Sequence, residues 1–300
     1  MTDLLSGRFA VVTGSSQGLG FHITDAYLAE GASVAICARN ADELAVAEQQ
    51  LRRHLRDGQR LLSVIADVTK REEVDALFAQ VEEEFGTIDI LVNNAGIYGP
   101  LGLLDEVPWS EWETAITVNL LGSALAMRAV IPIMKSRGYG KIIQLSGGGA
   151  TTPRPFASAY AASKMAVVRL AETVAEELRP FGIMVNSIAP GALNTRLLDE
   201  AIEAGPERIG REFYEKLLTQ KESGGAGFEA ATQLAVFLGS ARSDGITGKL
   251  ISAIWDDWED FPLNLEILSD SDLFTIRRIT PEERPLHWKS GNLSSEISNA

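Results

Sequence analysis

Short apolar runs alternate with longer amphipathic stretches from the start of the chain to about residue 252. Several of these runs, such as SVAICA (33–38), are apolar almost throughout. This alternation is typical of a parallel sheet that helices cover on both faces, because strands buried on both sides have no polar face. Ligands of such sheets bind beyond the carboxyl ends of the strands. We expect strands within 8–14, 33–38, 60–68, 88–96, 140–147, 183–191 and 249–254, and helices within 19–31, 41–55, 71–86, 111–136 and around Tyr160.

The alternation ends near Ser252, and the remaining residues have a different character. They are acidic, contain tryptophans and lack the strand–helix pattern. We therefore expect a single domain over residues 1–254 and a C-terminal extension over residues 255–300. The last part of the extension is expected to be poorly ordered, because chain ends that nothing ties down usually are.

Charge and composition narrow the classes of protein that the chain can belong to. Its 27 Lys and Arg residues stand against 41 Asp and Glu residues, a formal net charge of -14. An excess of this sign argues against nucleic acid or an anionic membrane as the main partner. No stretch approaches the roughly 20 apolar residues of a membrane span, and the first residues do not resemble a signal peptide. The single cysteine, Cys37, suits a reducing cytoplasm, where we expect the protein to reside.

A glycine-rich turn, TGSSQGLG, joins the first expected strand to the first expected helix. Glycines at 14, 18 and 20 permit a tight turn, close approach of a pyrophosphate and close helix packing. The helix that follows offers free N–H groups and the positive end of its dipole to phosphate. The turn therefore predicts a dinucleotide site. The alternative is an ordinary tight turn between a strand and a helix.

The residues that end the second and third strands bear on which dinucleotide would bind. Arg39 stands where NAD-binding sites usually carry a carboxylate for the ribose hydroxyls, and an arginine there suits the 2′-phosphate of NADP. We therefore favour NADP and keep NAD open, because Asp42 and Glu43 follow closely and Arg39 could be a solvated loop residue. Asp67 could accept from an adenine amino group, or it could cap the next helix.

Tyr160 and Lys164, in the stretch SAYAASKMAVVRL, lie four residues apart and so on one face of a helix. A nearby positive charge lowers the pKa of a phenol from about 10. A phenol tuned in this way can exchange a proton with a carbinol or carbonyl oxygen. The alternative is a pair of surface residues with no role in catalysis.

Two further polar residues are candidates for the same site. Ser146 ends the fifth strand and could donate a hydrogen bond to a substrate oxygen, or it could be a turn serine. Asn119 lies in an apolar helical face, where a buried amide needs partners. It could therefore simply join helices.

Taken in order, these pieces resemble the short-chain dehydrogenase/reductase family. The resemblance covers Gly7 to about Ser252. The matching motifs are TGSSQGLG, NNAG (93–96), Asn119, Ser146, YAASK (160–164) and the pair Pro190 and Gly191. The resemblance implies a Rossmann-type doubly wound parallel sheet of seven strands in one NAD(P)-binding domain.

The resemblance also implies roles for the candidate residues. Tyr160 would be the general acid/base, Lys164 would lower the pKa of the phenol and bind the nicotinamide ribose, Ser146 would orient the substrate oxygen, and Asn119 would hold a water in a proton relay. Gln17 departs from the basic residue of many NADP-dependent members. The predicted cofactor-binding residues are Gly14, Ser16, Gln17, Gly18, Leu19, Gly20, Arg39, Asp67, Val68, Asn93, Ala95, Gly96, Tyr160, Lys164, Pro190, Gly191 and Thr195.

The expected reaction is hydride transfer between NADP(H) and a polar ketone or secondary alcohol, such as a sugar derivative. No metal is expected, because His22, His54 and His287 are scattered. Substrate identity would lie in the glycine-rich loop after Ser146 and in residues 192–228, where Arg154 and Arg196 could meet an anionic or sugar-like substrate. Two alternatives stay open: a catalytically idle dinucleotide sensor, and a lyase or epimerase on the same scaffold.

The resemblance implies a homodimer or homotetramer, and the extension raises a related question. Trp255, Trp258 and Phe261 lie close together in IWDDWEDF, interleaved with carboxylates that resist burial. An amphipathic strip that packs its rings and exposes its acids fits this pattern. We expect it to pack across a subunit boundary and close a neighbouring active site. The alternative is a tail folded back on its own subunit.

Overall fold

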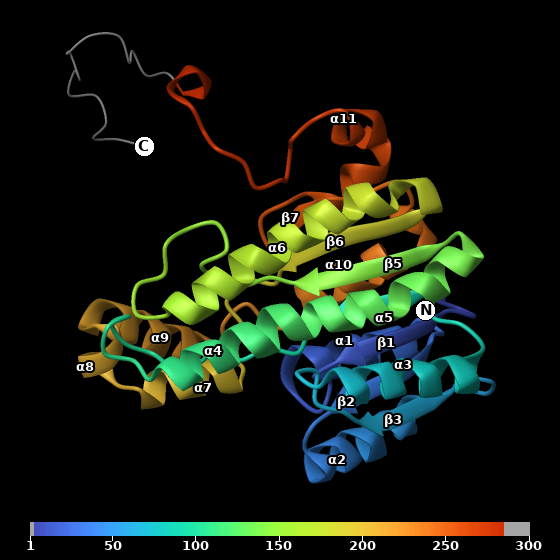
Figure 1. Cartoon of the computed structure of the whole chain (residues 1–300), viewed down its shortest axis with the longest axis horizontal. Coiled ribbons are helices and arrows are strands. Elements are labelled where there is room, and N and C mark those ends of the chain that lie inside the picture. The colour runs from blue at the N-terminus through green and yellow to red at the C-terminus, as the bar shows by residue number, and fades with distance from the viewer. Residues whose placement is uncertain (1–2, 285–300) are drawn as a thin grey trace.

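The computed structural model of the chain describes residues 3–284, except the side chain of Glu282. Its centre is one parallel sheet of seven strands in the order β3-β2-β1-β4-β5-β6-β7 (Figure 1). The prediction of a Rossmann-type doubly wound sheet is confirmed. The strands are β1 Phe9–Thr13, β2 Ser33–Ala38, β3 Leu61–Ile65, β4 Ile90–Asn93, β5 Gly140–Leu145, β6 Ile183–Ala189 and β7 Leu250–Ser252.

Helices cover both faces of this sheet, as Figure 1 shows. One apolar cluster joins one face to α1, α2 and α10, and a second joins the other face to α3, α5 and α6. A third group, α7 to α9, lies at the end of the sheet where the carboxyl ends of the strands emerge. The helices are α1 Gly18–Ala29, α2 Ala41–Leu51, α3 Arg71–Phe85, α4 Trp109–Ile116, α5 Gly122–Arg137, α6 Ser158–Leu178, α7 Arg196–Glu203, α8 Pro206–Ile209, α9 Arg211–Ser223, α10 Glu229–Gly239 and α11 Leu265–Ser269.

The strand order reverses direction between β1 and β4, which pair in the middle of the sheet. From β1 the chain moves outward to β2 and β3, and it then returns to β4 on the other side of β1. Crossovers on either side of this point diverge, so a crevice opens at the carboxyl ends of β1 and β4. The topology places the glycine-rich turn after β1 at this crevice.

Helices α4 and α5 form one long rod, Trp109–Arg137, with a π-helical turn at Thr117–Leu121 between them. By length and composition alone the rod could cross a membrane, and it is the one such helix among residues 3–284. It packs against α3 and α6, as a core helix of a globular domain does. A π turn is an uncommon irregularity that is frequent at functional sites, and this one holds Asn119.

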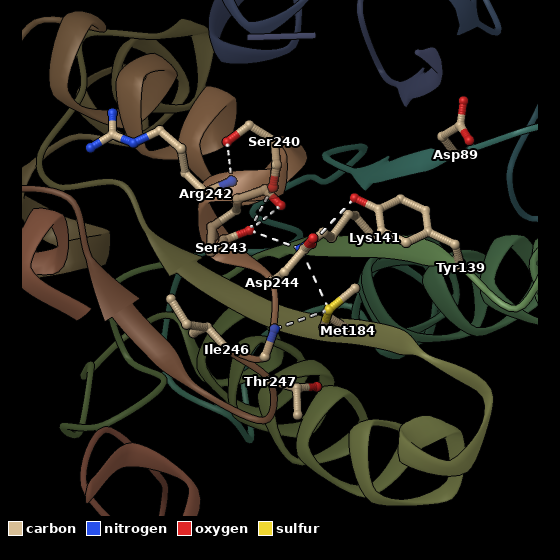
Figure 2. Close-up of polar contacts among 12 residues, drawn as sticks. Asp89, Tyr139, Lys141, Met184, Ser240, Arg242, Ser243, Asp244, Ile246 and Thr247 are labelled. Carbon is tan, nitrogen blue, oxygen red and sulfur yellow. Dashed lines mark hydrogen bonds and ion pairs between the residues drawn. The ribbon is translucent and has the colours of Figure 1, made fainter. Parts of the chain in front are cut away.

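The edge of the sheet opposite the crevice contains a buried lysine, Lys141 at the start of β5 (Figure 2). Its Nζ lies 2.7 Å from Asp244 Oδ1 and 3.0 Å from Ser243 Oγ. Burial lowers the pKa of Lys141, and the contact with Asp244 opposes this shift. The interaction ties β5 to the turn after α10, and the sequence pattern of β5 gave no sign of it.

The described part of the extension folds back on its own subunit. Trp258 and Phe261 are buried in the same apolar cluster as α1 and α10, and the Trp258 ring lies 5.2 Å from that of Phe237. Trp255, in contrast, is 85% exposed on the single chain, so its packing across a subunit boundary stays a prediction. Residues 285–300, where disorder was expected, lie outside the described part. The boundary at residue 254 stays a prediction.

Candidate active site

A cleft with a volume of about 660 Å³ opens at the carboxyl edge of the sheet. The loops after β1 to β6, α6 and the α7–α9 group line it. Most residues predicted from the sequence lie in this lining. They are Gly14, Ser16, Gln17, Gly18, Leu19, Arg39, Asp67, Val68, Ala95, Gly96, Ser146, Tyr160, Lys164, Pro190, Gly191 and Thr195. Gly20, Asn93 and Asn119 do not line the cleft.

The glycine-rich turn is held too tightly for side chains at two positions. A Cβ at Gly14, whose φ is +63°, would lie 2.7 Å from Ala95 Cα. A Cβ at Gly20 would lie 2.5 Å from the carbonyl oxygen of Gly14. Asn94 Nδ2 donates to the carbonyls of Thr13 and Gly14, at 3.0 and 2.9 Å. Gly20 therefore shapes the turn without lining the cleft.

The start of α1 faces the cleft without a side-chain cap, because its N-cap residue, Gln17, makes no capping hydrogen bond. Uncapped N–H groups at the start of a helix can bind a phosphate, and the glycines of the preceding turn leave room for it to approach. The turn thus fits the pyrophosphate of a dinucleotide.

The far side of the cleft carries charges of both signs. Arg39, at the end of β2, is exposed and lines the cleft, as does Glu43 from α2. Ser16 Oγ donates to Glu43 Oε2 at 3.4 Å. A 2′-phosphate placed here would meet the guanidinium of Arg39, whereas ribose hydroxyls would meet the Glu43 carboxylate. The far side of the cleft therefore offers a partner to either dinucleotide, NADP or NAD.

Asp67 does not cap the following helix, so that alternative was wrong. The N-cap of α3 is Lys70, and Asp67 Oδ1 instead accepts from the N–H and hydroxyl of Thr69 at 2.9 and 2.8 Å. Burial opposes ionisation, but these hydrogen bonds and the charges of Arg39 and Lys70 outweigh it, so the pKa of Asp67 is lowered. Its carboxylate lines the cleft, where it can accept from an adenine amino group.

Asn93, the last residue of β4, does not line the cleft, although the sequence predicted that it contacts the cofactor. The Asn93 side chain is buried beneath the cleft and donates to the carbonyl of Ser123 at 3.3 Å. It does not line the cleft, whereas Asn94 does. The reason is the alternation of side chains along a strand: Asn93 still belongs to β4 and points into the helical layer that contains α5.

Ser146, Tyr160 and Lys164 meet in the middle of the cleft. The Ser146 hydroxyl is buried and has no hydrogen-bond partner. A Cβ at Gly147, the next residue, would lie 2.3 Å from the Tyr160 hydroxyl, so the phenol oxygen sits directly against that backbone. Lys164 Nζ donates to the carbonyl of Leu145 at 3.0 Å and lies 5.6 Å from the centre of the Tyr160 ring.

The pKa shifts differ from what the sequence suggested. Burial raises the pKa of Tyr160 well above its ordinary value, Tyr98 adds to this, and Arg154 opposes it. The expected lowering by Lys164 is therefore absent from the folded chain alone, because desolvation of the phenol dominates. Burial also lowers the pKa of Lys164 to about 8. An uncharged phenol is a proton donor, which suits protonation of a developing alkoxide.

Asn119 is fully engaged in joining segments of the fold. Its Oδ1 accepts from the N–H of Ile97 at 2.8 Å, and its Nδ2 donates to the Ile97 carbonyl at 2.9 Å and to Ser163 Oγ at 2.8 Å. These contacts fix the loop after β4 to α6 behind Lys164. They match the packing alternative, and a role in holding a water stays a prediction.

Tyr98 was missed from the sequence, and Trp255 was expected at the site of a neighbouring subunit rather than at that of its own chain. Tyr98 packs against Tyr160 with 4.5 Å between ring centres, and its only signal was its place two residues after NNAG. Trp255, from the extension, lines the cleft with an exposed ring. Tyr98 belongs to the apolar cluster that includes residues of α7 and α9.

Comparison with known proteins agrees with this fold and cleft. The family model described as short chain dehydrogenase matches residues 8–205. The chain is 39% identical to 3beta-hydroxysteroid dehydrogenase 1 of Eggerthella lenta, covering 83% of this chain and 92% of that protein. It is 36% identical to D-beta-hydroxybutyrate dehydrogenase of Rhizobium meliloti, over 65% of this chain and 75% of the relative.

Solved structures lead to the same family. Gluconate 5-dehydrogenase of Burkholderia cenocepacia, in complex with NADP and tartrate, superimposes with a TM-score of 0.73 at 31% identity, covering 84% of this chain and 95% of that one. The chain therefore belongs to the short-chain dehydrogenase/reductase family, and it is an oxidoreductase that acts on hydroxyl or carbonyl groups.

Proposed function

We propose that the protein transfers hydride between NADP(H) and a polar ketone or secondary alcohol. The observation that carries this proposal is the hydroxyl of Ser146, which is buried in the cleft without a partner. Buried polar groups are normally satisfied, so a hydroxyl left open beside the Tyr160 phenol is suited to a substrate oxygen. The sugar-like substrate expected from the sequence belongs to the same polar class.

Some residues of the cleft would bind the cofactor, and others would take part in proton transfer. The turn Gly14–Gly20 and the start of α1 would hold the pyrophosphate, and Arg39 would meet the 2′-phosphate. When bound, NADPH supplies the hydride. Ser146 and the Tyr160 phenol donate hydrogen bonds to the substrate oxygen and stabilise the charge that develops on it. Tyr160 then delivers the proton, and Lys164 orients the ribose.

Two features of the cleft weigh against the alternative functions, an idle sensor and a lyase or epimerase. A sensor without catalytic activity does not need a serine hydroxyl that lacks a hydrogen-bond partner beside a phenol. A lyase or epimerase needs further acid/base groups near Ser146, but the adjacent positions are glycines 147 to 149. The preference for NADP over NAD, a homodimer or homotetramer, and a cytoplasmic location remain part of this proposal; the relative that binds NADP supports the first.

Turnover with both cofactors tests the proposal. The purified protein is mixed with NADPH or NADH and a panel of ketones that includes ketoses, keto acids and cyclic ketones, and absorbance of the reduced cofactor is followed. We expect oxidation of NADPH with at least one polar ketone and a smaller kcat/KM with NADH. Tight NADPH binding without turnover of any ketone or alcohol would favour the sensor, and isomerised product without net cofactor oxidation would favour the epimerase.

A further inference from the structure

We propose that Arg154 binds a carboxylate of the substrate, so that the enzyme acts on hydroxy acids and keto acids in preference to neutral alcohols and ketones. This inference rests on the proposed function, because it assigns the substrate class of the same cleft. It is carried by the surroundings of Arg154, which the sequence presented as one of two candidate arginines with a solvated loop as the alternative.

Arg154 follows the glycine-rich loop after β5, and this half-buried side chain places its guanidinium among aromatic rings. The guanidinium carbon lies 4.8 Å from the ring centre of Phe213, 5.4 Å from that of Tyr98 and 6.0 Å from that of Tyr160. The Leu198 and Leu217 side chains belong to the same apolar cluster as these tyrosines. Rings and aliphatic groups exclude water, which strengthens any ion pair formed here.

The hydrogen-bonding capacity of Arg154 is largely unused. Its Nη2 donates to the Tyr98 hydroxyl at 2.7 Å, whereas its Nε is buried without a partner. Among residues 3–284, no carboxylate forms an ion pair with it. The fold therefore leaves a half-buried positive charge, with unused N–H donors, that an anionic ligand can pair with.

Arg196, in the same cleft, provides a contrast. Its Nε lies 3.2 Å from Glu200 Oε1, and its Nη1 lies 3.9 Å from Glu43 Oε1. Its charge is therefore balanced from within the chain. Of the two arginines named from the sequence, Arg154 is the one with charge available for an anionic substrate.

The position of Arg154 relative to the reacting groups limits how far the hydroxyl of an acidic substrate can lie from its carboxylate. A Cβ at Gly147 would lie 2.3 Å from the Tyr160 hydroxyl, and a Cβ at Gly148 would lie 2.3 Å from Arg154 Nη1. Consecutive Cα atoms are about 3.8 Å apart, so phenol and guanidinium contact neighbouring residues of one loop. A short acid could place its carboxylate on Arg154 and its carbinol or ketone at Tyr160 and Ser146. This geometry suits an acid whose hydroxyl lies a few carbons from the carboxylate.

Matched acidic and neutral substrates test the inference. The rate of NADPH oxidation is measured with acetoacetate and acetoacetamide, and with 5-keto-D-gluconate and D-fructose, for the wild type and for Arg154→Met, Arg154→Lys and Arg196→Met. A charge-assisted bidentate contact corresponds to about ten- to a hundredfold. We expect the wild type to favour the acid of at least one pair by this factor and Arg154→Met to remove the preference. Arg154→Lys should retain part of it, and Arg196→Met should change the acid-to-neutral ratio less than about threefold.

A wild type that turns over acids and neutral partners equally would overturn the inference while leaving the proposed function intact. So would an equal loss of kcat/KM for acid and neutral substrate in Arg154→Met. Should Arg154→Met not fold, Gly148→Ala replaces it, because its Cβ would displace the guanidinium and should lower the same ratio.

A binding measurement keeps the test independent of turnover. NADPH fluorescence of the binary complex is titrated with D-3-hydroxybutyrate and with its amide, neither of which NADPH can reduce. Binding of the acid at least tenfold tighter than the amide, lost in Arg154→Met, supports the inference even if no ketone in the panel is reduced. Equal binding of both ligands, or of neither, overturns it.

Discussion

The most specific consequence of the site geometry concerns Gly147. Its φ is not in the left-handed region, so an alanine there strains no backbone. The new Cβ would lie 2.3 Å from the Tyr160 hydroxyl, whereas ordinary contacts begin at 3.4 Å, so the phenol oxygen must move by about 1 Å. A misplacement of about 1 Å at a reacting group costs on the order of a hundredfold in rate, or about 2.7 kcal/mol in activation free energy. Gly147→Ala should therefore lower kcat about a hundredfold.

The assay is steady-state NADPH oxidation with the best neutral ketone, together with a fluorescence titration of NADPH. Affinity for NADPH should change less than threefold, because the phosphate-binding turn is on another loop. Gly148→Ala is the matched control: its Cβ would meet only the end of the long Arg154 side chain and not the phenol, so it should lower kcat for the neutral ketone far less. A Gly147→Ala enzyme with kcat within threefold of the wild type would refute the placement of the phenol.

Three further changes test other parts of the structure. Arg39→Ala should raise KM for NADPH about ten- to a hundredfold and leave KM for NADH nearly unchanged; an equal effect on both would remove Arg39 from the 2′-phosphate site. Burial lowers the pKa of Lys164 to about 8 from 10.5, so above pH 8 the unfolded chain holds a proton that the native chain releases. The free energy of unfolding should then rise by up to about 3 kcal/mol from pH 8 to 10.5 relative to Lys164→Met, and parallel pH profiles in urea titrations would contradict this. Trp258→Ala should cost about 3–5 kcal/mol of unfolding free energy, and Trp255→Ala less than about 0.5 kcal/mol; similar losses would mean that the exposed ring is also packed.

The sheet could be predicted from the sequence because its strands are buried on both faces. Runs such as SVAICA leave no choice of face, and the glycine-rich turn fixes where the first strand ends. The cleft could be predicted for the same reason: the carboxyl ends of parallel strands meet at one edge, so Ser146 and the turn had to lie at the same edge of the sheet.

What the sequence could not provide was the direction and environment of individual side chains. Asn93 and Asn94 are consecutive residues, and the point at which β4 ends decides which of their side chains reaches the cleft. The balance between desolvation and charge at Tyr160 depends on how many atoms surround the phenol, which spacing alone does not give. Arg154 and Arg196 look alike in the sequence, and only their neighbours show which one has its charge balanced.

The central claim is that Tyr160 gives the proton while other groups bind the cofactor. The measurement that tests it most directly is single-turnover NADPH oxidation by Tyr160→Phe, with the affinity for NADPH determined on the same preparation. The ring still packs against Tyr98, so NADPH should bind within threefold of the wild-type affinity, while the rate falls by about 10²–10⁴-fold, the usual contribution of general acid/base catalysis. A rate close to that of the wild type, with NADPH binding intact, would contradict the account.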